Sequence, residues 1–511
     1  MTRSSAAVAP PSSASSLGQT TARGAVWLIA QNAGGRVVGF LAQLVIAAIL
    51  SPADFGVIGL AYTVSTFGAM LTNYGVESVL LQRQKTLGLW IVPAFWYSFG
   101  VGTLGFILVL ILGPIAGRIY HMPQVALLAA VIGISIPVTA LATIPSVLLR
   151  ARFQFRAIAG IGLAETLLIQ GLTIGLALAG YGALSFALPL PIVAILRTAV
   201  VWSLPRPAMA GLFSRIGRVK YLMNSSMVVF CTGVVQSAIS QGGYIVLGVL
   251  GNEVAVGVYF FAFKLASQPL MLMAISLSNV LFPALSHMRS APVAQGAAAF
   301  RAAKLLGLLI MPMAFLQAAV IEPAMHVFFA SKWDASIPLM QILSIALGFD
   351  AISWVAGTLV TAQRAFRRQF IYVLSCAPPF FVLVTIGGWN GSALGVALGV
   401  AVHYMLVSPT YSYFVFRRCG IGLGSLATIY LRPAAIAALG VAAALGASSA
   451  LHIHSDLVRI ASISAVFSVV YLALLRMADA DGFKDAQSLI AQMLIRRIST
   501  KSPVSRAGIA G

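Results

Sequence analysis

Long apolar runs recur along the whole chain and limit what it can fold into. Each run has about 20 residues or more, which is enough to cross the hydrocarbon core of a bilayer as a helix. Only 8% of the 511 residues are charged, whereas about a quarter are charged in an ordinary soluble domain. The chain therefore cannot cover a water-facing surface, and we predict an all-α polytopic membrane protein.

Charges, glycines and prolines divide the apolar sequence into about fourteen predicted transmembrane helices. The first six occupy residues 24–50, 55–80, 88–117, 124–149, 157–180 and 181–204. The next six occupy residues 222–250, 254–286, 302–330, 336–361, 369–389 and 391–416, and a last pair occupies 433–451 and 457–475. Two of the divisions depend on short glycine-containing turns, Gly180-Tyr181-Gly182 and Trp389-Asn390-Gly391.

Basic residues indicate the orientation of these helices. In a soluble protein a net charge of +21 would suggest nucleic acid. With the N-terminus inside, however, 26 of the 32 Lys and Arg residues fall in cytoplasmic segments and three in outer loops. This distribution follows the positive-inside rule, so we expect cytoplasmic N- and C-termini, the lipid bilayer as a partner, and no nucleic acid.

The first twelve predicted helices read as one six-helix unit used twice. The matching segments are LSPADFGVIGLAY (50–62) with LGNEVAVGVYFFA (250–262), ALSFAL (183–188) with ALGVAL (393–398), and RARFQFR (150–156) with QRAFRRQ (363–369). An even number of helices gives both copies the same orientation, so we expect two bundles related by a pseudo-two-fold axis along the membrane normal, with the substrate path between them.

This repeat defines the predicted domains. They are a disordered cytoplasmic N-terminus (1–22), an N-lobe (23–204), a cytoplasmic linker (205–221), a C-lobe (222–416), two peripheral helices (417–477) and a cytoplasmic tail (478–511). The linker alternates basic and apolar residues, which predicts an amphipathic helix on the membrane surface. No loop is long enough for a catalytic domain and no GxxxxGK[ST] motif is present, so we predict that the protein is not an enzyme.

Arg36 is a basic residue deep inside the first predicted helix. It lies about twelve residues from the cytoplasmic end, or about 18 Å, which is too deep for comfortable snorkelling. Burying a charge at this depth costs at least about 2.5 to 3.5 kcal/mol. Two interpretations follow: Arg36 lines an aqueous cavity and meets an anionic group, or it forms a structural ion pair with a neighbouring helix.

Four other charged residues fall well inside predicted helices. Glu165 and Arg197 lie at similar depth on adjacent helices, and we predict a structural ion pair between them. Lys264 and Asp350 lie nearer the middle of the second bundle. Lys264 is a candidate cavity residue, and Asp350 is a candidate for ion coupling or for pairing with Lys264.

Uncharged residues add weaker signals. We select Gln31, Asn32, Gln236 and Gln241 as polar candidates for the cavity lining.

Pro269, Pro312 and the pair Pro378-Pro379 lie inside helices, where each frees a backbone group that the protein or cavity water must satisfy. The GSALGVALG run predicts close helix packing. The scattered cysteines and histidines have no metal-ligand spacing, so we predict no metal site and no cofactor.

Three segments resemble the polysaccharide transporter branch of the multidrug/oligosaccharidyl-lipid/polysaccharide (MOP) superfamily, which includes O-antigen, colanic-acid and exopolysaccharide translocases. They are AILSPADFGVIGLAYTVSTFGAMLTNYGVESVLLQRQ (48–84), LFPALSHMRSAPVAQGAAAFRAAKLLGLLIMPMAF (281–315) and FFASKWDASIPLMQILSIALG (328–348). The resemblance implies two six-helix lobes around a V-shaped cavity in the bacterial inner membrane. It also implies flipping of an undecaprenyl-diphosphate-linked oligosaccharide by alternating access, with a polysaccharide polymerase or export machinery as further partners.

In related lipid flippases, cationic residues on the first helix face the cavity and are proposed to hold the diphosphate. Arg36 fits that pattern, and an Arg fork suits a diphosphate in both geometry and charge.

Two other functions remain open from the sequence. A multidrug or organic-ion exporter of the same superfamily would want acidic residues in the cavity, whereas three of the five deep charges are basic. A membrane polymerase or glycosyltransferase would need charged motifs on large outer loops, and these loops are short. A membrane scaffold that transports nothing is the residual alternative.

Overall fold

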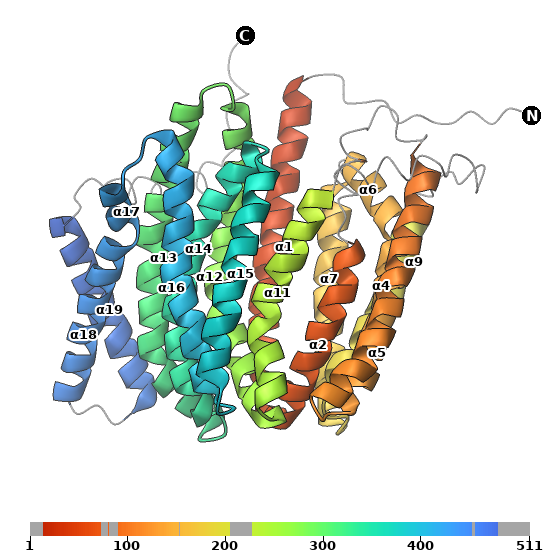
Figure 1. The fold of residues 1–511 in the computed structure, drawn as a ribbon, viewed down its shortest axis with the longest axis horizontal. Helices are drawn as coiled ribbons and strands as arrows, with labels where there is room; N and C mark the ends of the chain where they lie inside the picture. The colour runs from red at the N-terminus through yellow and green to blue at the C-terminus, as the bar shows by residue number, and fades with distance from the viewer. Residues whose placement is uncertain are drawn as a thin grey trace, which may run out of the picture. The chain divides into compact units, whose positions relative to one another are not determined.

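The computed structural model describes residues 14–72, 80, 90–152, 154–204, 227–451 and 455–478, and all their regular structure is helical (Figure 1). The helices of the first part are α1 (Ala14–Ile49), α2 (Pro52–Thr72), α4 (Ile91–Ile119), α5 (Gln124–Leu141), α6 (Thr143–Ala151), α7 (Phe155–Leu178), α8 (Leu184–Ala187) and α9 (Pro189–Ser203). Those of the second part are α11 (Met227–Leu250), α12 (Glu253–His287), α13 (Pro292–Phe329), α14 (Ile337–Ala362), α15 (Phe366–Gly388), α16 (Ala393–Phe416), α17 (Leu423–Ile429), α18 (Leu431–Ala450) and α19 (Asp456–Ala478).

The predicted class is confirmed. Among the described residues, thirteen helices are long and apolar enough to cross a membrane, and α1, with its apolar stretch Gly34–Ile49, takes the place of the first predicted span. The protein is therefore a multi-pass membrane protein. The expected turn between the fifth and sixth spans is present, because Gly180 and Gly182 adopt φ angles of +84° and +52° that only glycine reaches readily.

Several domain boundaries fall partly on residues outside the described part of the chain. These are residues 1–13 of the N-terminus, the linker and the tail beyond Ala478. Within the predicted N-terminal segment, residues 14–22 belong to α1. The helix begins earlier than predicted because adding residues to an existing helix costs much less than nucleating a new one.

The chain forms two compact units. Unit 1 comprises Met1–Phe261 and Val373–Val396, and unit 2 comprises Ala262–Tyr372 and Ala397–Gly511. Their boundaries fall inside α12, α15 and α16, so three long helices each contribute to both units. The division into an N-lobe and a C-lobe stays a prediction.

In unit 1, α2 and the start of α12 cross at two glycines. A methyl group added to Gly56 would meet the carbonyl of Glu253. A methyl group added to Gly257 would meet the carbonyl of Pro52. Both pairs of equivalent residues are 201 positions apart, one residue from the offset of the sequence repeat. Such a reciprocal contact is what a two-fold relation between two copies of one unit produces.

The α15–α16 turn brings a second pair of glycines together. A methyl group on Gly387 would meet the carbonyl of Gly395, and one on Gly395 would meet the carbonyl of Gly387. Gly395 belongs to the GSALGVALG run, and its contact is the close helix packing that this run predicts.

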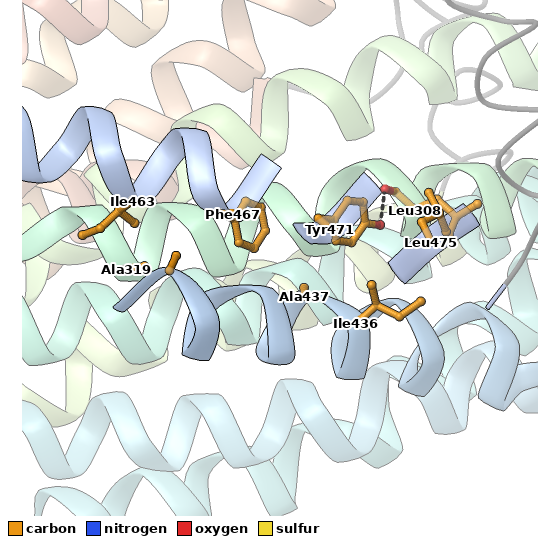
Figure 2. Close-up of a cluster of buried hydrophobic side chains, with 9 residues drawn as sticks. Leu308, Ala319, Ile436, Ala437, Ile463, Phe467, Tyr471 and Leu475 are labelled. Atoms are coloured by element: carbon orange, nitrogen blue, oxygen red, sulfur yellow. Dashed lines mark hydrogen bonds between the residues drawn. The ribbon is translucent and has the colours of Figure 1, made fainter. Parts of the chain in front are cut away.

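In unit 2, α13 is the central element. It packs against α14, α18 and α19. A buried apolar cluster joins α13, α18 and α19, and Figure 2 shows it. Its members are Leu308, Ala319, Ile436, Ala437, Ala444, Ile463, Phe467, Tyr471 and Leu475.

At one end of unit 2, polar side chains donate hydrogen bonds to backbone carbonyls in the last turns of two helices. Arg289, just after α12, donates from Nε and Nη2 to the carbonyl of Ala362 at 2.9 and 2.7 Å. Gln295, which is 1% exposed, donates to the carbonyl of Leu285 at 2.8 Å and accepts from Gln363 at 3.2 Å. These bonds fix the last turns of α12 and α14, whose carbonyls have no partner within the helix.

Candidate functional site

Arg36 lies on α1, which packs along α7 in parallel register. Three contacts define the register, each between a glycine and a polar side chain: Gly162 with Gln31, Gly35 with Thr166, and Gly39 with Gln170. Each pair is 131 residues apart, and successive pairs are four residues, or about one helical turn, further along both helices. The glycines therefore let α1 approach α7 closely, with Arg36 beside this seam.

Arg36 is half-buried. Within the described part of the chain, no carboxylate forms a salt bridge with it. The α1–α7 register places Arg36 within about 3 Å in depth of Glu165, at 1.5 Å of rise per residue. Glu165 is the nearest acid in this register, but it is engaged elsewhere.

Glu165 forms a salt bridge with Arg197 of α9. The distance from Arg197 Nε to Glu165 Oε2 is 3.2 Å, and the two side chains are 28% and 31% exposed. The expected pairing between adjacent spans is therefore present. Since it neutralises two of the three deep charges at this level, Arg36 supplies the remaining positive charge; a role of the pair in ion coupling stays a prediction.

The four amide candidates occupy different environments. Gln31 packs against Gly162 of α7, and Asn32 is in α1 with a side chain outside the described part of the structure. Gln236 on α11 is exposed. Gln241, also on α11, donates from Nε2 to Oγ1 of Thr66 on α2 at 3.1 Å. Gln241 thus links two helices, and Gln236 is free to meet a solute.

Unit 2 contains the other two charged candidates. Lys264 is half-buried on α12, five residues before Pro269. Asp350 is half-buried on α14, and its carboxylate is held by neutral donors. Ser408 of α16 donates to Oδ1 at 3.0 Å and Trp354 donates to Oδ2 at 3.2 Å. A pairing of Asp350 with Lys264 stays a prediction.

The polar cluster around Asp350 extends to the start of α18. Ser412 and Tyr430 share a hydrogen bond of 2.7 Å, and both side chains are at most 2% exposed. The ring of Tyr430 stacks on Phe349, the residue before Asp350, with the centroids 5.9 Å apart. A carboxylate with donors on both oxygens can keep its negative charge in an apolar region, or exchange those donors for a proton or a cation.

The observed hydrogen-bond partners of Asp350 were not predicted from the sequence. Ser353 and Trp354 lie three and four residues after it, so the helical i, i+3 and i, i+4 rule could have placed them on the same face. Ser408 comes from another helix, 58 residues away, and Tyr430, which bonds Ser412 beside it, lies 80 residues away; no local pattern identifies either residue.

A family model described as "Polysaccharide biosynthesis protein" matches residues 45–338, more than half of the chain. The chain belongs to this polysaccharide biosynthesis protein family. The matched region runs from the end of α1 to the start of α14, so it includes Glu165, Arg197 and Lys264, while Arg36 and Asp350 lie outside it.

Curated relatives of this family member have similar length. The succinoglycan biosynthesis transport protein ExoT of Rhizobium meliloti (strain 1021) is 24% identical over 96% of this chain and 98% of its own. The lipopolysaccharide biosynthesis protein WzxC of Escherichia coli (strain K12) is 22% identical over 80% of this chain and 83% of its own.

Solved structures share the fold of this family member. A lipid II flippase, MurJ, in an inward closed conformation gives a TM-score of 0.69 at 14% identity and covers 87% of this chain and 98% of its own. A mutant of the Vibrio cholerae MATE transporter VcmN gives 0.52 at 14% identity, over 80% of this chain and 98% of its own. The chain therefore shares the fold of these two transporters.

Proposed function

We propose that the protein is a flippase that moves an undecaprenyl-diphosphate-linked oligosaccharide repeat unit across the bacterial inner membrane for surface polysaccharide biosynthesis. The observation that carries this proposal is the match to the succinoglycan biosynthesis transport protein over nearly the full length of both chains. The flippase fold of a lipid II transporter agrees with it. Alternating access is the mechanism, and both termini are cytoplasmic.

Arg36 is the proposed contact for the diphosphate. Its guanidinium carries a full positive charge, is half-buried, and has no salt-bridge partner in the described residues. A diphosphate is a concentrated anion that an Arg fork can bind through two parallel N–H···O bonds. With the cell interior negative, each negative charge moved outward gains about 2.3 kcal/mol per 100 mV. The membrane potential can therefore drive transport without an ATP site.

The experiment measures lipid-linked oligosaccharide in each membrane leaflet of cells that lack the gene and carry wild type, Arg36→Ala, Arg36→Lys or the double variant Glu165→Gln/Arg197→Gln. We expect the glycolipid to accumulate on the cytoplasmic leaflet without the gene and with Arg36→Ala. Loss of a charged hydrogen-bonding group costs about 1.5–3 kcal/mol, or roughly 10- to 150-fold in affinity. Arg36→Lys should retain part of the activity because the charge remains.

The double variant Glu165→Gln/Arg197→Gln is the matched control, since it removes an arginine at similar depth together with its own partner and leaves no unpaired acid beside Arg36. It should transport far better than Arg36→Ala at equal protein level. Unchanged leaflet distribution in the deletion strain, with no redundant flippase, would refute the proposed function. Normal transport by Arg36→Ala would refute the diphosphate site alone.

The alternative is a multidrug or organic-ion exporter, whose fold the MATE transporter represents. The half-buried carboxylate of Asp350 is the feature that favours it, because a cation exporter needs an acid within the membrane. Deletion strains would then become sensitive to lipophilic cations while lipid-linked oligosaccharide stayed normal.

A further inference from the structure

A proline inside a membrane helix leaves one carbonyl without its usual donor. Proline has no N–H, so the carbonyl four residues earlier loses its helical hydrogen bond. In a bilayer no water replaces this bond, and another protein group must supply a donor. The 38-residue helix α13 contains Pro312, which deprives the carbonyl of Leu308 in this way.

Tyr471 of α19 supplies the missing donor. Its hydroxyl donates to the carbonyl oxygen of Leu308 at 2.9 Å, across 163 residues of sequence (Figure 2). Tyr471 and Leu308 are 6% and 3% exposed, so water does not compete for the bond. Phe467, one turn earlier on α19, stacks on the Tyr471 ring with the centroids 5.8 Å apart and so holds the hydroxyl in place.

The same arrangement occurs in unit 1. Leu141 ends α5, the chain breaks its helix at Ala142, and Pro145 follows four residues after Leu141 in α6. The carbonyl of Leu141 therefore has no backbone donor at position 145. The indole Nε1 of Trp202, on α9, donates to it at 3.1 Å.

A third instance lies on α12. Pro269 frees the carbonyl of Leu265. Gln317 of α13 directs its Nε2 at this carbonyl at 3.4 Å and at the carbonyl of Ala266 at 3.3 Å. The bond is longer and divided between two acceptors, so it is the weakest of the three.

We propose that Tyr471, Gln317 and Trp202 act as proline braces, side chains that replace the backbone N–H that proline lacks and fix the bend of a neighbouring helix. Through Tyr471, the terminal hairpin α18–α19 sets the shape of α13 and moves with it as one body. Pro323, eleven residues further along α13, frees the carbonyl of Ala319, for which the described residues provide no side-chain donor. The same helix thus has one braced proline and one that can still bend.

A double-mutant cycle tests the brace at Pro312. Tyr471→Phe removes only the hydroxyl, and Pro312→Ala restores an N–H that can bond the Leu308 carbonyl within the helix. Measured on the purified full chain in detergent, Tyr471→Phe should lower the melting temperature by several degrees when Pro312 is present. In the Pro312→Ala background, the same substitution should lower it by less than half as much.

Tyr181→Phe is the matched control. Tyr181 is 52% exposed in a turn, so the Tyr181→Phe variant should have the melting temperature of wild type. An equal loss from Tyr471→Phe in both backgrounds would overturn the proposal, because the hydroxyl would then act independently of the proline.

If Pro312→Ala does not fold, a comparison of hydrogen–deuterium exchange between wild type and Tyr471→Phe tests the brace instead. Faster exchange in residues 306–318, with unchanged exchange in α2, supports the brace; identical exchange in residues 306–318 refutes it. None of these measurements depends on the transported substrate, so the proposed function and the braces can fail separately.

Discussion

Replacing Gly257 by alanine should destabilise the protein because the added methyl group has no room. It would lie 2.8 Å from the backbone nitrogen of Gly56 and closer still to the carbonyl oxygen of Pro52. A Cβ atom almost never approaches another heavy atom within 3.0 Å. Both neighbouring atoms belong to the backbone, so no side chain can rotate away, and α2 and α12 must separate.

The expected magnitude combines two opposing effects. Overpacking of this kind costs about 1–3 kcal/mol, whereas alanine in a helix is about 0.5–1 kcal/mol better than glycine. The difference leaves a net loss in the free energy of unfolding of about 0–2.5 kcal/mol, and because both clashes are with rigid backbone we expect about 1–2 kcal/mol. A thermal melt of the purified protein in detergent, followed by loss of the monodisperse peak on size exclusion, measures it as a fall of a few degrees.

The reciprocal contact sharpens this prediction. Gly56→Ala should cost about as much as Gly257→Ala, and the double variant should cost less than the sum, because one separation of the helices makes room for both methyl groups. Gly171→Ala on α7 is the control, since a methyl group there meets nothing within 4 Å, and it should melt at or above the wild-type temperature. If Gly257→Ala melts like Gly171→Ala, the close crossing of α2 and α12 is refuted.

Two further predictions concern the intramembrane charges. Ser408→Ala removes the 3.0 Å hydrogen bond to Asp350. If the carboxylate is charged, this should lower the free energy of unfolding by about 1.5–3 kcal/mol, measured in a thermal melt. Ser449→Ala is the exposed control, and an equal melting temperature for the two variants would contradict a charged Asp350. A double-mutant cycle of Glu165→Gln and Arg197→Gln should give a coupling energy of at most about 1 kcal/mol, because both side chains are about 30% exposed. A value above about 2 kcal/mol would contradict access of water to this pair.

Much of the fold could be predicted from local sequence. A span is recognised by the length of its apolar run, because the thickness of the bilayer sets that length. The turn at Gly180-Tyr181-Gly182 was predictable because two close glycines break an apolar run, and both adopt positive φ. The salt bridge between Glu165 and Arg197 was also predictable, since adjacent helices bring charges of equal depth together.

The candidate site was less predictable. The depth of Arg36 follows from counting residues, but its lack of a salt-bridge partner among the described residues depends on Glu165 being held by Arg197. Ser408 donates a hydrogen bond to Asp350 and Tyr430 stacks on the neighbouring Phe349, and both come from segments that the sequence does not connect to α14. A single sequence shows which residues are polar, but it does not show which of them are in contact in the folded protein.

Taken by itself, the sequence determined that the protein is a helical membrane protein with a repeated unit, because hydrophobic length, charge asymmetry and glycine turns act over short distances along the chain. It also marked Pro312 as the source of an unsatisfied carbonyl. Only the tertiary structure decided that Tyr471 satisfies it and that Gly56 and Gly257 are the point where α2 and α12 cross. These contacts join residues far apart in the chain, and their register depends on how whole helices pack, which no local pattern encodes.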